Sequence, residues 1–384
     1  MVLLAMLPDP LLAAERTLLR DMIGQMLLVG FRGTAVDGDS PILRDIREHN
    51  LGGVILFDRD VQLQSAERNI QSPEQVRALT ASLQASARVP LFVAVDQEGG
   101  RVRRFKEAQG FPPSPSAKAM GQGTTAQTRL EGERTGKLLA DLGVNLNFAP
   151  VADVDINPQS PAIGALERSF SADPDLVALH ADAFCRGLLA QGVLPCLKHF
   201  PGHGSASVDS HRGLTDISAT WTSAELRPYE MLIPLKASPL IMTGHLFLRQ
   251  LDDAYPSTLS RAVLTGLLRQ RLGFEGVIVS DDMQMRAIAD HYGQAEALLL
   301  AVEAGVDVLV FGNNLDYDPE IVPKAIDILV KAVEDGRLSP ERIEASHDRI
   351  LAAKQQLCTR FALAGAGAER FERGLTLAAP CALP

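Results

Sequence analysis

The sequence lacks several features that mark large classes of protein. No apolar run approaches the roughly 18 to 20 residues needed to cross a bilayer, so we expect no membrane-spanning segment. No lysine- or arginine-rich run is present, and the formal net charge of the 384 residues is −10. Because nucleic acids bind basic patches, we expect neither DNA nor RNA as a partner.

Cysteine is also scarce. The chain has four cysteines, no two of them have C-x-x-C spacing, and two lie in apolar runs. This pattern predicts reduced thiols in a core rather than a disulfide framework or a zinc site, and it favours a reducing compartment. The apolar opening Met1–Pro8 lacks the basic region of a secretory signal, so we do not expect one there.

Hydrophobic residues make up 46% of the chain, and they recur as short runs at long intervals. Amphipathic stretches with helical period separate most of these runs, which is the pattern of strand, helix, strand, helix. Eight such strands favour an α/β fold that forms a single-domain (β/α)8 TIM barrel over an open doubly wound sheet. The expected strands cover residues 26–31, 53–57, 91–96, 144–154, 193–200, 240–246, 276–282 and 306–311, and the helices include 73–87, 126–142, 175–191, 260–272, 294–304 and 340–357.

The domain boundaries follow from this pattern. We expect an N-terminal extension over residues 1–20, the barrel over 21–358 and a loosely ordered tail over 359–384. Polar side chains stand at or just past the end of most expected strands, on the face where barrel active sites assemble. They are Asp96, Asp153, Lys198, His199, His245, Asp281 and Asn313.

The segment from Lys198 to His211 is the densest in proton-transfer groups, with three histidines, a lysine and an aspartate in fourteen residues. Within it, the carboxylate of Asp209 could accept the ring N–H of His211 and make that histidine a proton-transfer group near neutral pH. The alternative is that Asp209 and His211 lie on the same loop by chance and have no catalytic role. The histidine spacing on a loop broken by Pro and Gly does not resemble a metal-ligand set, so we expect no metal.

Two further segments carry carboxylates to strand ends. Asp281 and Asp282 follow the expected strand 276–280, and only one of them can point into the centre of the barrel. The alternative to a catalytic role is that an aspartate here is the N-cap of the next helix. The segment from Asp96 to Arg104, D-Q-E-G-G-R-V-R-R, offers acceptors and donors suited to a sugar. An Asp–Arg ion pair bracing the barrel rim is the compatible alternative.

Six motifs together resemble the bacterial β-N-acetylglucosaminidases of glycoside hydrolase family 3. They are V-D-Q-E-G-G-R-V, N-F-A-P-V-A-D-V, E-R-S-F, K-H-F-P-G-H-G, D-S-H and V-S-D-D-M, in this order, and the resemblance covers about residues 20 to 357. It implies a cytoplasmic barrel enzyme without a cofactor that removes N-acetylglucosamine from muropeptides during cell-wall recycling. One departure is Ser205, which stands where many relatives carry an aspartate.

The resemblance also implies residue roles. Asp281 matches the nucleophile and His211 the acid/base, assisted by Asp209, while Asp96, Arg104, Arg168, Lys198 and His199 match residues that hold the sugar. We therefore predict a retaining exo-β-N-acetylglucosaminidase, which we expect to be a monomer with a carbohydrate substrate. A neutral histidine base would repel phosphate less than a carboxylate, so a phosphorylase is the first alternative. A β-glucosidase and a non-catalytic sugar-binding barrel are the others.

Overall fold

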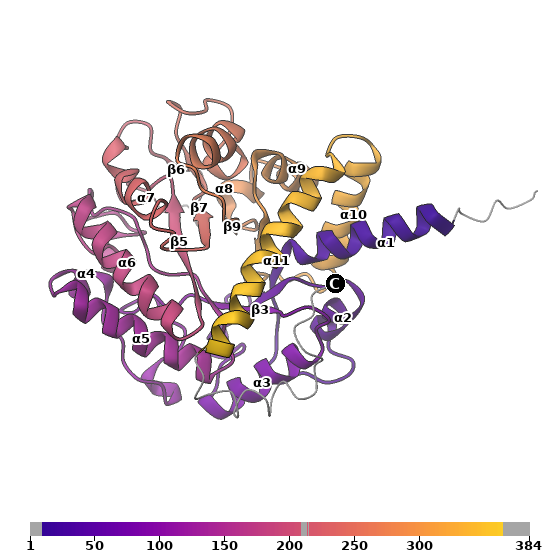
Figure 1. Cartoon of the computed structure of the whole chain (residues 1–384), viewed down its shortest axis with the longest axis horizontal. Coiled ribbons are helices and arrows are strands. Elements are labelled where there is room, and N and C mark those ends of the chain that lie inside the picture. The colour runs from indigo at the N-terminus through magenta and orange to yellow at the C-terminus, as the bar shows by residue number, and fades with distance from the viewer. Residues whose placement is uncertain (1–9, 209–212, 214, 364–384) are drawn as a thin grey trace, which may run out of the picture.

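The computed structural model describes residues 10–208, 213 and 215–363. Eight parallel strands form a closed barrel in the order β1-β10-β9-β7-β5-β4-β3-β2, with helices around it (Figure 1). The barrel predicted from the eight apolar runs is therefore confirmed. The strands are β1 (Leu27–Gly30), β2 (Gly53–Ile55), β3 (Phe92–Val95), β4 (Leu146–Asn147), β5 (Leu194–Phe200), β7 (Leu240–Thr243), β9 (Val277–Asp282) and β10 (Val308–Phe311).

The run predicted over 144–154 is the one that differs most from its strand. Only Leu146 and Asn147 form β4, and the chain leaves the regular ladder before Pro150, which has no N–H to donate. The side chain of Asn147 instead makes hydrogen bonds to both backbone groups of Gln97. Its Oδ1 accepts the Gln97 N–H, and its Nδ2 donates to the Gln97 carbonyl oxygen. These contacts hold the segment after β3 close to β4.

The helices surround the barrel, and several begin at residues that cap them. Thr124 and Gln127 form a reciprocal capping box at the start of α5, and Ser72 caps α3 ahead of Pro73. The longer helices are α1 (Pro10–Gln25), α2 (Pro41–Glu48), α3 (Pro73–Ala85), α5 (Thr125–Asp141), α6 (Pro174–Ala190), a π-helix over Ala262–Arg271, α9 (Gln294–Ala304), α10 (Ile321–Glu334) and α11 (Pro340–Leu363). Shorter ones are α4 (Ala117–Gly121), α7 (Arg227–Leu232) and α8 (Arg286–Ala289).

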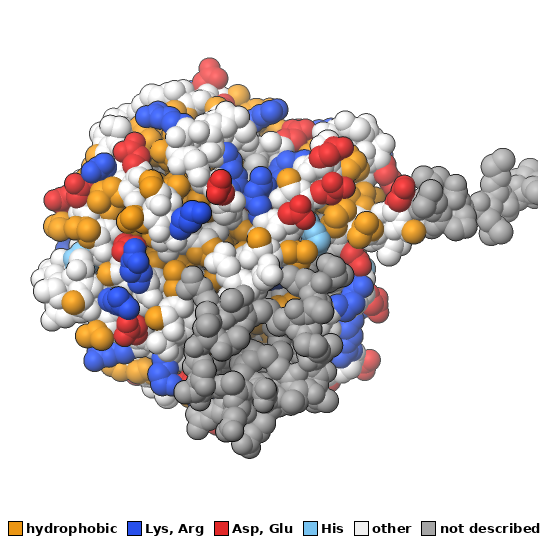
Figure 2. Space-filling view, viewed as in Figure 1, with side chains coloured by type: hydrophobic (Ala, Val, Ile, Leu, Met, Phe, Trp, Pro, Cys, Tyr) orange, Lys and Arg blue, Asp and Glu red, His pale blue; other side chains and the backbone are white. Residues whose placement is uncertain are grey.

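Helix α1 runs through the boundary that the sequence pattern placed between residues 20 and 21. It packs against α10 and α11, and its Ile23 is fully buried. Figure 1 shows α11 crossing the end of the barrel beside α1. On the face seen in Figure 2, acidic and basic side chains are interspersed with apolar ones over the described surface.

A small parallel sheet lies beyond the carboxyl ends of the barrel strands. It pairs β6 (Thr215–Asp216) with β8 (Leu246–Phe247), and the eight-unit pattern did not predict it. A second apolar cluster, formed by Ala206, Ile217, Leu246 and Leu248, packs beside it. This cluster supports the segments that follow β5 and β7. Within the ranges that the structure describes, no helix has both the length and the apolarity to cross a membrane.

Candidate active site

The carboxyl ends of β3 and β5 bring together charged residues that lie about a hundred positions apart. Lys198 Nζ lies 2.8 Å from Asp96 Oδ1 and 2.6 Å from Glu98 Oε1. Arg104 donates to the other Asp96 oxygen at 3.0 Å. Lys198 is almost fully buried, with 2% of its side chain exposed, so these pairs are formed largely out of water. The expected ion pair at the barrel rim is therefore present and belongs to a larger network.

Arg168 joins this network through Glu98, a residue that the sequence reasoning did not select. Two nitrogens of Arg168 donate to the two Glu98 oxygens at 2.8 and 2.7 Å, which is a bidentate pair. One of those nitrogens also lies 3.4 Å from His199 Nε2. The position of Glu98 two residues after Asp96, in the same D-Q-E-G-G-R motif, was the available signal. Nothing in the sequence shows that its side chain turns toward Arg168.

Asp153, after β4, holds the histidine-containing turn that follows Lys198. Its Oδ2 lies 2.7 Å from His199 Nδ1, and its Oδ1 accepts the backbone N–H groups of His199 at 3.1 Å and of His203 at 2.8 Å. When a carboxylate accepts the Nδ1 hydrogen of a neutral histidine ring, the other ring nitrogen, Nε2, is an acceptor. His199 therefore presents Nε2 toward Arg168.

The charged groups stabilise one another in their ionised forms. Burial alone would raise the pKa of Asp96, but the charges of Lys198 and Arg104 outweigh it and the pKa is lowered. The pKa of Glu98 is lowered in the same way, because Arg168 and Lys198 outweigh its burial. Burial would lower the pKa of Lys198, yet the two carboxylates raise it. At neutral pH the cluster therefore carries fixed, alternating charges.

His203 differs from its neighbours. Burial, reinforced by the nearby His199, lowers the pKa of His203 to about 4. It is therefore neutral near pH 7 and packs edge-on against the His199 ring, with centroids 5.7 Å apart.

The two aspartates at the end of β9 have different surroundings. Asp282 Oδ1 accepts N–H groups from Gln284 at 3.0 Å and from Gly312 at 2.9 Å, so Asp282 anchors the turn after the strand and the start of the loop after β10. Asp281 is half-buried at the strand's end and accepts the backbone N–H of Asp282 at 2.8 Å. The helix N-cap role left open from the sequence falls to neither aspartate, because the next helix, α8, begins at Arg286 with Met285 as its N-cap.

His245 also has defined contacts. Its Nε2 lies 2.9 Å from the Asp282 carbonyl oxygen and its Nδ1 lies 2.8 Å from Thr258 Oγ1. His245 is fully buried, so it braces the backbone that carries the two aspartates.

Two of the predicted catalytic residues, Asp209 and His211, lie outside the described residues. The chain is described up to Val208, and the turn that precedes it is well packed beside Asp153. The structure therefore places all five predicted substrate-binding residues in or beside one network and Asp281 at the end of β9, which β7 separates from β5. Those five are Asp96, Arg104, Arg168, Lys198 and His199.

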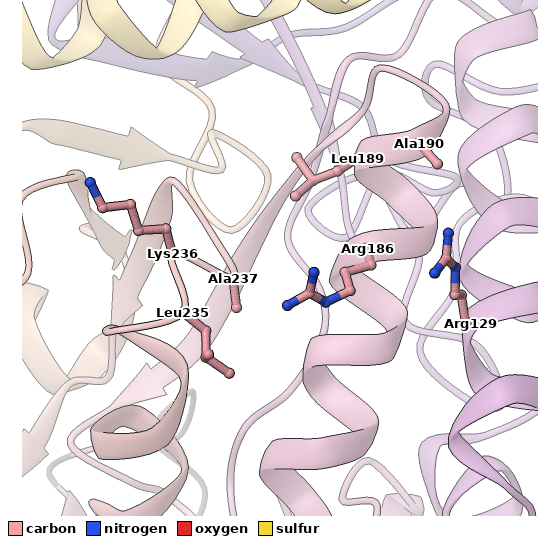
Figure 3. Close-up of a pocket in the computed structure, with 7 residues that line it drawn as sticks. All are labelled: Arg129, Arg186, Leu189, Ala190, Leu235, Lys236 and Ala237. Carbon is pink, nitrogen blue, oxygen red and sulfur yellow. The ribbon is translucent and has the colours of Figure 1, made fainter.

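The pocket in Figure 3 lies away from this network. It has a volume of about 330 Å³ and is lined by residues from α5, from the end of α6 and from the loop before β7, so it sits at the amino ends of the strands. Arg186 of α6 extends toward the loop that carries Leu235 and Ala237 (Figure 3). Parallel barrels build their active sites at the opposite end, so this pocket is not part of the candidate site.

The closed parallel barrel with polar residues at its carboxyl end defines the class of TIM-barrel proteins. Residues 18–353 match the Glycosyl hydrolase family 3 N terminal domain, and the chain belongs to that family. The chain is 33% identical to Beta-hexosaminidase A of Pseudoalteromonas piscicida over 377 residues, covering 88% of this chain and 61% of that protein. It is 34% identical to Beta-hexosaminidase LpqI of Mycobacterium tuberculosis, covering 87% of this chain and 82% of that protein.

Solved structures of related proteins are similar over most of this chain. A glycoside hydrolase family 3 β-N-acetylglucosaminidase from Paenibacillus sp. superposes with a TM-score of 0.81 and 36% identity, covering 90% of this chain and 63% of that one. Zinc-bound CbsA from Thermotoga neapolitana superposes with a TM-score of 0.75 and 27% identity, covering 88% of this chain and 68% of that one. The chain thus spans about three-fifths of the length of the Pseudoalteromonas and Paenibacillus proteins.

Proposed function

We propose that this protein is a retaining exo-β-N-acetylglucosaminidase that removes terminal N-acetylglucosamine from peptidoglycan fragments or chitooligosaccharides. The observation that carries the proposal is the buried network of Asp96, Glu98, Arg168 and Lys198 at the carboxyl end of the barrel. A sugar presents hydroxyl and amide groups that need fixed donors and acceptors. The names of the relatives, which are hexosaminidases and an N-acetylglucosaminidase, support the same substrate class.

The network suits the recognition of one sugar ring. Asp96 is partly exposed while both of its oxygens hold cations, so it is an oriented acceptor for ring hydroxyls. Arg168 and His199 present a donor and a ring nitrogen side by side, an arrangement that suits an acetamide group. Arg104 and Lys198 complete this set of proposed sugar contacts. Because their partners are already in place, little reorganisation is needed when the substrate binds.

The proposed chemistry is a double displacement. Asp281 attacks the anomeric carbon and forms a glycosyl-enzyme intermediate, while His211, with Asp209 as its partner, protonates the leaving oxygen. The same histidine then accepts a proton from the incoming water, whose oxygen attacks the anomeric carbon and releases Asp281. The half-buried position of Asp281 at the end of β9, beside Asp282 that anchors the following turn, supports the first role.

The substitution Asp281→Ala tests the nucleophile. Turnover of an aryl N-acetylglucosaminide should fall by at least about 10⁴-fold, because a group that forms the intermediate is removed. Circular dichroism should show an intact fold. Asp290→Ala changes an exposed aspartate just after α8 and should keep wild-type turnover. Substantial activity in Asp281→Ala would contradict the assignment.

Product analysis separates the alternatives. With phosphate present, release of free N-acetylglucosamine indicates hydrolysis, whereas N-acetylglucosamine 1-phosphate as the main product would establish the phosphorylase. Faster turnover of an aryl glucoside than of the N-acetylglucosaminide would favour a β-glucosidase. Binding of the sugar without any turnover would indicate a non-catalytic sugar-binding barrel.

We also propose that the reaction needs no metal, although one structural relative is described with bound zinc. Asp153 and His199 already pair with each other, and the site's cations are side chains, so charge stabilisation is supplied by the protein. Activity should survive prolonged dialysis against a chelator. A loss of activity that zinc restores would overturn this part of the proposal. A cytoplasmic location, a role in cell-wall recycling and a monomeric state remain predictions.

A further inference from the structure

Two carboxylates hold the turn that follows Lys198, one on each side. On one side, Asp153 accepts the backbone N–H groups of His199 and His203. On the other side, Glu225 Oε2 accepts the backbone N–H of Gly204 at 2.8 Å. Glu225 comes from a distant part of the chain, just before α7, and the functional proposal above gives it no role.

The turn fits tightly against Glu225. Gly202 has a φ of +121°, and a Cβ added there would lie 2.5 Å from the Cβ of Glu225. A Cβ added at Gly204 would lie 1.7 Å from the carbonyl oxygen of Val154. The two glycines therefore allow the turn to lie clamped between the segment after β4 and Glu225. No other residue would fit at either position without moving backbone.

A second contact from the same segment strengthens the clamp. Trp221 Nε1 donates to the carbonyl oxygen of Pro201 at 3.1 Å. Residues 221 and 225 thus hold the beginning and the end of the turn. Ser205 closes the turn, and Asp209 follows only four residues later in the sequence.

The carboxyl group of Glu225 accepts the backbone N–H of Gly204 in a buried setting. Glu225 is fully buried. Burial raises its pKa to about 7; the charge of Asp153 adds to this rise, while donors on Ser205 and Gly204 oppose it. The carboxyl oxygen can accept the Gly204 hydrogen bond in either protonation state.

We propose that Glu225 is a positioning residue for acid/base catalysis: it fixes the turn over residues 201–205 and so sets where the chain leads into Asp209 and His211. This inference rests on the proposed function, in which His211 protonates the leaving group. A purely structural role would lower stability or overall activity. A positioning role should instead affect the proton-transfer step selectively.

The test compares Glu225→Leu with the wild-type protein on two N-acetylglucosaminides. One substrate has an acidic aryl leaving group and the other has a second sugar as a poor leaving group. The kcat for the poor leaving group should fall by about 10- to 100-fold, because misplacing a catalytic group by about 1 Å can cost that much. The acidic aryl group leaves without much protonation, so its kcat should fall far less. Glu225→Gln keeps an acceptor for Gly204 and should restore kcat to within about threefold.

Three further variants make the result interpretable. Glu230→Leu alters an exposed glutamate on α7 and should leave both kcat values unchanged. Trp221→Phe removes only the donor to Pro201, and it should give the same leaving-group pattern even if Glu225→Leu fails to fold. His211→Ala should show the strongest leaving-group dependence of all.

The outcomes separate the two proposals. Suppose that His211→Ala still shows its leaving-group dependence. The positioning role would then be overturned by equal losses on both substrates in Glu225→Leu or Trp221→Phe, or by failure of Glu225→Gln to restore kcat. If His211→Ala itself shows equal losses on both substrates, the proposed acid is wrong and the positioning role falls with it.

Discussion

At the scale of single residues, the site depends on a glutamate that no motif singled out. Glu98 is the shared partner of Arg168 and Lys198, and it is buried. Without its charge, the two neighbouring cations would lose the carboxylate that they share. Glu98 is thus the link between the two halves of the proposed sugar site.

We therefore predict that Glu98→Gln lowers kcat/KM for an aryl N-acetylglucosaminide by about 10- to 100-fold, the cost of losing charged hydrogen bonds. Thermal stability should fall as well, because the buried Arg168 loses its bidentate carboxylate partner. Steady-state kinetics and thermal unfolding measure the two effects. Glu107→Gln, which alters an exposed glutamate paired with Arg103, should match the wild type in both. A kcat/KM for Glu98→Gln equal to that of the control would show that Arg168 does not need its partner.

At the scale of elements, the close crossing of α5 and α6 depends on glycines that neither helix needs for its own conformation. A Cβ added at Gly187 would lie 2.5 Å from the carbonyl oxygen of Arg129 and 2.6 Å from the backbone nitrogen of Glu133. Alanine favours a helix over glycine by about 1 kcal/mol, so an isolated α6 would gain from the change. In the folded protein, however, an alanine at position 187 forces the backbone of α5 to move.

The prediction is that Gly187→Ala destabilises the protein by about 1–3 kcal/mol, since overpacking outweighs the gain in helix propensity. Denaturation by urea measures the free energy of unfolding. Gly266→Ala is the matched control: its nearest neighbour would be 3.9 Å away, so only the propensity gain should appear. An increase in stability in Gly187→Ala would mean that α5 and α6 are not held as close as the structure has them.

The predicted and observed elements agree where periodicity alone decides the structure. All eight apolar runs became barrel strands, and the helical stretches such as 126–142 and 175–191 match α5 and α6 within one residue. The pair of β6 and β8 was not predicted, because two-residue strands leave no alternating pattern in the sequence. The length of β4 was overestimated, because its apolar run continues through residues that form no regular ladder.

At the scale of the whole molecule, α11 closes the barrel end opposite the site with a buried lysine. Lys354 is fully buried and donates to Gln25 Oε1 at 2.7 Å and to the Gly52 carbonyl oxygen at 2.8 Å, both uncharged acceptors. Its Nζ also lies 4.8 Å from the centroid of the Phe92 ring. One side chain thus ties the last helix to the beginnings of three strands.

Burial lowers the pKa of Lys354 to about 7, whereas an unfolded lysine has a pKa of about 10.4. Between these values the unfolded chain binds more protons than the folded one, so stability should rise as the pH increases from 7 toward 10. We expect a gain of about 1–3 kcal/mol in the free energy of unfolding between pH 7 and 9 in the wild-type protein.

The measurement is urea denaturation at several pH values for wild-type protein, Lys354→Met and Lys137→Met, the last of which alters an exposed lysine. The slope with pH should disappear in Lys354→Met and persist in Lys137→Met. A slope that survives in Lys354→Met would assign the pH dependence to other groups.

The sequence by itself determined the class of fold and the end of the barrel where chemistry is expected. Strands and helices follow from periods of hydrophobicity that are local, and the polar residues after each run mark the strand ends. The tertiary structure alone decided the pairing of Glu98 with Arg168, the contacts of Asp282 with Gln284 and Gly312, and the clamp of Glu225 on Gly204. These contacts depend on how the loops fold over the carboxyl end of the barrel, and local hydrophobic periodicity carries no signal for them.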